Sequence, residues 1–140
     1  MKLNLSAPQF DKQTGLITIV VIHVPKNEQS ALPGGAILMV AHANEEAYRL
    51  TLSTGYAHFW SRSRNSLWKK GETSGNVIPV YKIVMDCDRD TVLYFTEVGL
   101  ENFATCHLGS ISCFGSCLIG NLPDLSIRTA EYEVHESFTN

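Results

Sequence analysis

Two groups of residues in the chain have the types and spacing that could bind metal ions. In the first group, Asp86, Asp88 and Asp90 occupy alternate positions. In extended backbone their side chains would share one side, with Cys87 on the other. Three carboxylates suit a hard divalent ion such as Mg²⁺. A polar turn without a metal is the alternative, because Asp is common in turns.

The second group consists of thiols and an imidazole. Cys87 lies inside the acidic stretch, and Cys106-His107 and Cys113 follow it. Three Cys with a nearby His suit Zn²⁺ and leave a fourth position for water. Buried free Cys can instead act as small hydrophobes, but the polar flanks here favour a metal. Cys117, at a C-x₃-C spacing from Cys113, is interpreted as a small or half-buried thiol.

Residues 61–76 are a candidate site for a phosphate-bearing ligand. This segment gathers four cations, five hydroxyls and two glycines, which are groups that bind phosphates. Trp60 and Trp68 could stack on a base. A solvated basic hairpin explains the composition equally well. The candidate binding residues are Trp60, Arg62, Arg64, Trp68, Lys69, Gly71, Glu72, Thr73, Ser74, Gly75 and Asn76.

The elements that must position these residues predict an α+β fold, a mostly antiparallel twisted sheet with one main helix. Asn44 is the expected N-cap of the helix, which runs to about Ser53 with Gly55 as its stop. Ala47, Leu50 and Leu52 form its expected apolar side. β-branched and aromatic runs predict strands over residues 16–24, 36–41, 56–60, 77–85, 91–98 and 126–134, the first two as a hairpin.

The composition indicates one globular domain over residues 1–140, with an N-terminal entry segment (1–15) and a C-terminal extension (118–140). Apolar residues make up 44% and charged residues 18% of the chain. A net charge of −3 without a basic block argues against a nucleic-acid or membrane-surface protein. No apolar run could span a bilayer, and residues 1–6 do not resemble a signal peptide. We therefore expect a cytoplasmic protein with reduced thiols.

Three stretches together resemble the phosphoribosyl-AMP cyclohydrolase family of histidine biosynthesis. They are residues 58–64 (HFWSRSR), 67–76 (LWKKGETSGN) and 86–90 (DCDRD), and the pairs Cys106-His107 and Cys113-Phe114 complete the pattern. The resemblance covers roughly residues 15–115. The long central run is specific enough that chance explains it poorly.

The resemblance implies an enzyme that adds water at C6 of N1-(5-phosphoribosyl)-AMP and breaks the N1–C6 bond. It implies Zn²⁺ on Cys87, Cys106 and Cys113, contributed by two subunits of an intertwined homodimer, and Mg²⁺ on the three Asp of residues 86–90. It also implies that His107 carries a proton. Such a reaction is chemically favourable, because N1-glycosylation makes C6 electron-poor and zinc lowers the pKa of a bound water.

The chain departs from the family pattern at a few positions. Ile78 stands where the family usually has Gln, Leu108 follows the Cys-His pair, and His42 precedes the helix. These departures keep two alternatives open at the level of sequence. One is a paralogous zinc hydrolase for another purine nucleotide, and the other is a non-catalytic module that binds zinc or a nucleotide.

Overall fold

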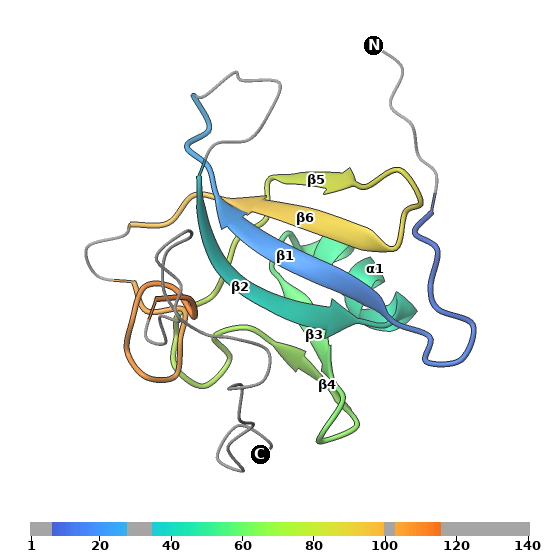
Figure 1. The fold of residues 1–140 in the computed structure, drawn as a ribbon. Helices are drawn as coiled ribbons and strands as arrows, with labels where there is room; N and C mark the ends of the chain where they lie inside the picture. Colours follow the sequence, from blue (N-terminus) through green and yellow to red (C-terminus); the bar gives the residue numbers. More distant parts are fainter. Residues whose placement is uncertain (1–6, 28–34, 100–102, 116–140) are drawn as a thin grey trace, which may run out of the picture.

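The computed structural model describes residues 7–27, 35–99 and 103–115. Along these residues the chain forms one helix and two sheets, as the α+β prediction requires (Figure 1). The predicted strand over 126–134 and the thiol Cys117 lie outside the described residues. The elements are β1 (Ile17–His23), β2 (Ala36–Ala43), α1 (Glu45–Thr54), β3 (His58–Ser61), β4 (Ser66–Lys69), β5 (Lys82–Met85) and β6 (Thr91–Thr96).

The main sheet has the strand order β2-β1-β6-β5. The β1–β2 and β5–β6 pairs are antiparallel, which confirms the predicted hairpin. The central β1–β6 pair is parallel, so the sheet is mixed, although antiparallel pairs predominate. A parallel pair needs a long crossover, and here α1 and the β3–β4 hairpin lie in the connection between the paired strands.

The helix begins and ends where its capping residues predict. The Asn44 side chain accepts a hydrogen bond from the Ala47 N–H at 2.9 Å, and Gly55 adopts a left-handed φ of 77°. The buried face consists of Ala47, Tyr48 and Thr51. Leu52, which was expected on that face, is 57% exposed because its position points away from the buried stripe.

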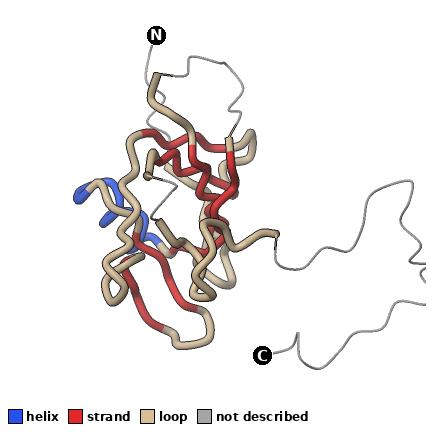
Figure 2. The backbone as a smooth tube through the Cα atoms, turned by 90° about the vertical axis from the view of Figure 1, so that its left-hand side faces the viewer, coloured by secondary structure: helices blue, strands red, loops and turns tan. Residues whose placement is uncertain are grey.

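The second sheet is the β3–β4 hairpin, which extends below the main sheet in Figures 1 and 2. Phe59 of β3 is fully buried and packs on Trp68 of β4, with ring centroids 5.0 Å apart, and on Tyr94 of β6 at 6.3 Å. These aromatic contacts join the hairpin to the core beneath the main sheet. The core therefore fixes the hairpin that carries the predicted phosphate-binding residues.

The strand predicted over 77–85 is shorter than expected. It forms only at Lys82–Met85, and upstream a single bridge joins Tyr56 to Pro79. Pro79 has no N–H to donate to a sheet, which limits regular pairing there. In the part of the chain that the structure describes, no helix is long and apolar enough to cross a membrane.

Candidate active site

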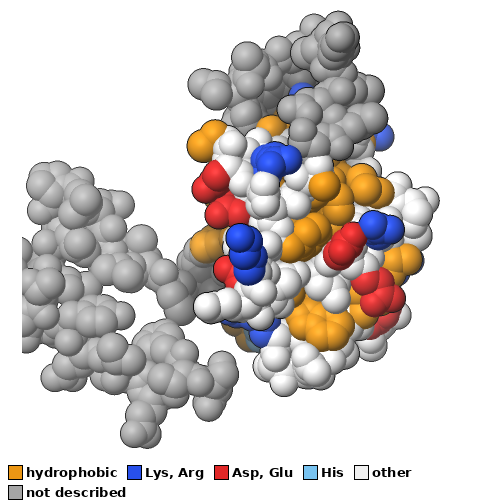
Figure 3. All heavy atoms as spheres, turned by 90° about the vertical axis from the view of Figure 1, so that its right-hand side faces the viewer, with side chains coloured by type: hydrophobic (Ala, Val, Ile, Leu, Met, Phe, Trp, Pro, Cys, Tyr) orange, Lys and Arg blue, Asp and Glu red, His pale blue; other side chains and the backbone are white. Residues whose placement is uncertain are grey.

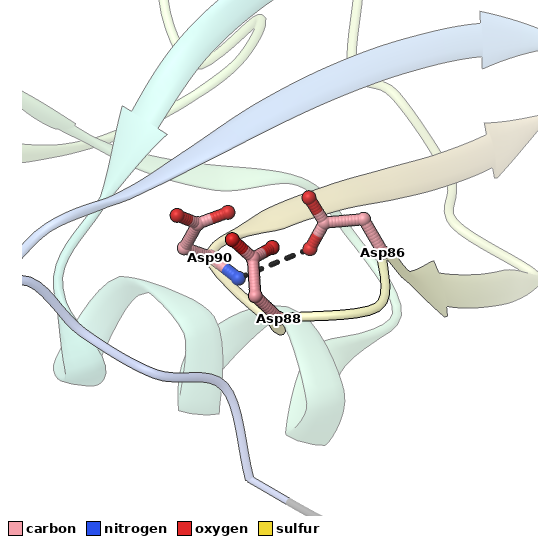
Figure 4. Close-up of side chains that lie close together, drawn as sticks. All are labelled: Asp86, Asp88 and Asp90. Carbon is pink, nitrogen blue, oxygen red and sulfur yellow. Dashed lines mark hydrogen bonds between the residues drawn. The ribbon is translucent and has the colours of Figure 1, made fainter.

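The three acidic residues converge in the turn between β5 and β6. One carboxylate oxygen from each of Asp86, Asp88 and Asp90 lies within 4.8 Å of the others (Figure 4). The backbone is a turn rather than the extended segment on which the sequence argument relied, and Arg89 adopts a left-handed φ of 63°. The carboxylates therefore gather because the chain turns, and a cation-sized group of oxygens results.

Hydrogen bonds inside the turn hold the acids in unequal states. The Asp86 carboxylate accepts from the backbone N–H groups of Asp90 at 3.1 Å and of Thr91 at 3.2 Å. Partial desolvation acts to raise the pKa of Asp86, but these bonds and one from Asp88 outweigh it and lower the pKa. For Asp88, hydrogen bonds with Asp86 and Asp90 raise the pKa, because ionisation would break them and add like charge.

No cationic side chain forms an ion pair with the acid cluster within the described ranges. Arg89, although it lies between two of the acids in sequence, donates to the Ala7 carbonyl at 3.2 Å. Figure 3 views the side of the molecule on which this turn lies and shows acidic, basic and hydrophobic side chains interspersed. The cluster thus keeps its carboxylate oxygens available to a divalent cation.

Two pockets extend from the acid cluster to the β3–β4 hairpin. The first, of about 400 Å³, includes Asp88, Asp90, His42 and Arg62 in its lining. The second, of about 510 Å³, shares two of these residues and adds aromatic and basic side chains. Its lining consists of Ala41, His42, Trp60, Ser61, Arg62, Ser63, Arg64 and Trp68. The predicted cation and nucleotide sites therefore adjoin along one surface.

His42 joins the two pockets, which the sequence did not reveal. It comes late in β2, and strand alternation predicts the side of the sheet on which it lies but not the residues that it contacts. Burial lowers the pKa of His42, and the Arg62 guanidinium lowers it further. The imidazole is therefore held towards its neutral form beside the acid cluster. Thr18 of β1 and Thr91 of β6 also line the first pocket and carried no sequence signal.

The remaining predicted binding residues lie away from these two pockets. The Lys69 ammonium stands over the Tyr56 ring, 4.7 Å from its centroid. Gly71 has a left-handed φ of 83°, and a Cβ there would lie 2.3 Å from backbone atoms of Asn76 and the next residue, so only glycine fits. The loop that this close approach creates exposes Glu72, Thr73, Ser74 and Gly75, and leaves Asn76 half-buried.

The thiols separate into a pair and a single residue. The Cys106 and Cys113 side chains lie within hydrogen-bonding contact, whereas Cys87 is exposed on the acidic turn. Among the residues that the structure describes, only the acids form a group of three potential ligands, so one chain does not bring Cys87 to the pair. The exposed His107 ring has its Nδ1 4.0 Å from Cys106 Sγ.

The paired thiols differ in their tendency to ionise. The Leu108 N–H contributes most to lowering the pKa of Cys106, and Ser110, Cys113 and the Lys70 ammonium act in the same direction against burial. Burial raises the pKa of Cys113, and the neighbouring Cys106 raises it further. Thiolates are the form that binds metals, so the loop around Cys106 favours the form of this side chain that could be a metal ligand.

Comparison with known proteins defines the class of this molecule. The family model described as phosphoribosyl-AMP cyclohydrolase matches residues 39–115. Proteins of that name are similar to this chain in Chelativorans sp. strain BNC1 (54% identity, covering 79% of this chain and 73% of the relative) and Archaeoglobus fulgidus (50%, covering 81% and 94%). The relative from Brucella anthropi is 48% identical over 86% of this chain and 78% of its own length.

The chain is thus an enzyme of the hydrolase class that serves histidine biosynthesis. It belongs to the phosphoribosyl-AMP cyclohydrolase family. The departures noted in the sequence fit this assignment. Ile78 is fully buried in the core, where it packs rather than lining either pocket. Leu108 is 71% exposed on the loop that carries Cys106 and Cys113 (residues 103–113, the thiol loop).

Proposed function

We propose that this protein hydrolyses N1-(5-phosphoribosyl)-AMP, opening the adenine ring at the N1–C6 bond. The observation that carries the proposal is the junction at Arg62 of two pockets, one bordered by the acid cluster and the other by Trp60 and Trp68. A nucleotide with two phosphates needs both charge neutralisation and a stacking surface, and this junction offers them side by side.

The acid cluster fits Mg²⁺, because its three carboxylates converge without an ion-pair partner among the described residues. Mg²⁺ on Asp86, Asp88 and Asp90 would neutralise one phosphate and Arg62 with Arg64 the other, while the two tryptophans hold the purine. Lys69 and residues 71–76 lie outside the two pockets and are proposed for substrate binding from the family resemblance alone. The full set proposed for substrate binding is Trp60, Arg62, Arg64, Trp68, Lys69, Gly71, Glu72, Thr73, Ser74, Gly75 and Asn76.

The thiol pair fits two of the three expected zinc ligands. We propose that Cys106 and Cys113 of one chain bind Zn²⁺ together with Cys87 of the partner subunit, so that the active site is shared in a homodimer. When bound, zinc lowers the pKa of a coordinated water to about 7. Thiolate ligands require a reducing compartment, which supports a cytoplasmic location.

His107 would move the proton that the reaction requires. Its exposed ring lies beside Cys106, with Nδ1 4.0 Å from Sγ, so it adjoins the proposed zinc position. The imidazole accepts a proton from the water that adds to C6 and returns it to N1 as the N1–C6 bond breaks. The oxygen of the water remains on C6 as the carbonyl of the product, and the second proton of the water is lost to solvent as this carbonyl forms from the cationic ring.

Turnover of phosphoribosyl-AMP, followed by ultraviolet absorbance, tests the proposed function. Purified dimer loaded with Zn²⁺ and Mg²⁺ is expected to open the ring, and chelator-treated protein is expected to regain turnover only after zinc is restored. Absence of turnover by zinc-loaded dimer would contradict the proposal and favour another purine nucleotide as substrate.

Asp88→Asn is expected to stabilise the metal-free protein and to remove most of its response to Mg²⁺. A raised carboxyl pKa in the fold means that ionised Asp88 costs stability. The free energy of unfolding is unaffected below the unfolded-state pKa, falls as the pH rises, and is reduced in full above the folded-state pKa. Asparagine cannot ionise, so the substitution removes this loss of stability. In the wild type, Mg²⁺ bound to the folded state should raise the melting temperature. Thermal unfolding at pH 7, with chelator or with millimolar Mg²⁺, measures both effects.

Glu46→Gln is the control for this experiment, because it makes the same change of charge in the first turn of α1, at a residue that is not part of the acid cluster. It should lower the melting temperature slightly by removing a favourable helix-dipole interaction, and leave the Mg²⁺ response intact. An Asp88→Asn protein that responds to Mg²⁺ as strongly as wild type would place the ion elsewhere.

A further inference from the structure

Lys70 makes a contact that separates it from the other cations of the hairpin. It follows β4 directly, and its backbone N–H donates to the Ala57 carbonyl at 3.0 Å, which fixes it at the base of the hairpin. Its half-buried ammonium donates to the carbonyl of Thr105, 35 residues further along the chain. The adjacent Lys69 instead stands over the Tyr56 ring. The two lysines therefore contact different parts of the fold.

The loop that Lys70 reaches is the thiol loop, residues 103–113. Within it, the N–H of Thr105 donates to the Ile111 carbonyl at 3.2 Å and that of Cys106 to Ser110 at 3.1 Å, so the loop closes on itself. Thr105 is 1% exposed and Cys106 is 8% exposed. In Figure 1 the loop lies beside the chain that follows β4. Lys70 thus bonds the Cys106 side of this loop to the hairpin.

The two thiols are held by different parts of the fold. The N–H of Cys113 donates to the Leu38 carbonyl at 2.8 Å, and the preceding Ser112 hydroxyl donates to the Ile37 carbonyl at 2.6 Å, so β2 anchors that side. Cys106 is tied to the hairpin through Lys70 and the Thr105 carbonyl. The relative position of the two sulfur atoms therefore depends on both anchors.

The positive charge of Lys70 acts on both sulfur atoms. The ammonium, bonded to the carbonyl of the residue before Cys106, lies close enough for a direct charge interaction with that sulfur. It also interacts with the charge of the neighbouring Cys113 sulfur. Two thiolates side by side repel each other, and a nearby ammonium offsets part of that repulsion.

We propose that Lys70 is a positioning residue of the thiol site, which fixes Cys106 relative to Cys113 and balances the charge of the ligated sulfurs, rather than a substrate phosphate ligand. The inference rests on the proposed zinc site. Groups that orient metal ligands from outside the coordination sphere typically contribute 10- to 100-fold in metal affinity. The same order of effect is expected here, because Lys70 supplies both a hydrogen bond and a charge.

Zinc affinity, measured by competition with a chromophoric chelator on the full-length dimer, tests this role. Lys70→Met is expected to weaken zinc binding about 10- to 100-fold. Lys70→Arg keeps the charge and a donor, and should recover much of the affinity. Lys70→Gln keeps a hydrogen-bond donor without the charge and disturbs the fold less than Lys70→Met. Its zinc affinity should lie between those of the Lys70→Met and Lys70→Arg proteins. Lys82→Met removes a lysine that stands over Phe95, away from the thiol loop, and should leave the affinity within about twofold of wild type.

Amide hydrogen exchange gives a second readout that does not depend on activity. In the zinc-loaded dimer, Lys70→Met should speed exchange at the Cys106 and Gly109 amides, which bond inside the loop, more than at Cys113, which bonds to β2. Unchanged zinc affinity and unchanged exchange in Lys70→Met would overturn the inference.

A Cys106→Ser protein in the same titration separates the two possible failures. If Cys106→Ser loses zinc and Lys70→Met keeps it, the zinc site stands and the role of Lys70 is wrong. If Cys106→Ser binds zinc as tightly as wild type, the zinc site itself is wrong, and the positioning role falls with it.

Discussion

Replacement of Cys106 by serine is expected to remove zinc and turnover together. Cys106 is buried on the thiol loop, in contact with Cys113, and its surroundings favour the thiolate. A serine hydroxyl is a far weaker ligand for zinc than a thiolate. Loss of a metal that contributes several kcal/mol to catalysis should lower kcat/KM at least about a thousandfold.

The measurement is zinc content by atomic spectroscopy after dialysis, with turnover assayed on the same samples. Cys117→Ser makes the same chemical change a few positions beyond the loop and is expected to keep both zinc and activity. Full zinc occupancy in Cys106→Ser would show that Cys106 is not a ligand. Loss of zinc in Cys117→Ser would instead indicate a closed site with four thiols.

The local elements could be predicted from sequence because their signals are local. Asn44 and Gly55 mark the ends of α1, and the β-branched run over 16–24 predicts β1, which forms at Ile17–His23. The parallel pairing of β1 with β6 has no such signal, because about seventy positions separate the paired residues and either direction satisfies the same hydrophobic pattern. The sheet therefore proved more mixed than expected.

In the candidate site, too, local features could be predicted from the sequence and contacts between distant residues could not. The acids were expected to cluster through strand alternation, whereas a turn with Arg89 in the left-handed region gathers them. The roles of His42 and Lys70 depend on residues remote in sequence, namely Arg62 and Thr105, so no spacing rule could reveal them. Ile78 is the opposite example. It departs from the family pattern and lies close to the binding segment in sequence, but in the fold it is a core residue.

Two inactive variants are expected to regain activity when their subunits are mixed. Within one chain Cys87 does not join Cys106 and Cys113, so the proposed zinc site needs Cys87 of the partner subunit. A dimer with one Cys87→Ala subunit and one Cys106→Ala subunit would then hold one intact site and one doubly defective site. In a statistical mixture half of the dimers are mixed, so activity should reach roughly a quarter of wild type.

The experiment denatures and refolds the two variants together and compares them with each variant refolded alone. A mixture of Cys106→Ala with Cys113→Ala is the matched control. Both ligands come from the same chain in the proposed site, so no pairing of these variants restores it, and the mixture should stay inactive. Recovery in the first mixture and not in the second follows only if Cys87 crosses between subunits. If neither mixture regains activity although the refolded dimers exchange subunits, all three thiols must act within one chain. The thiol loop would then have to move to the acidic turn.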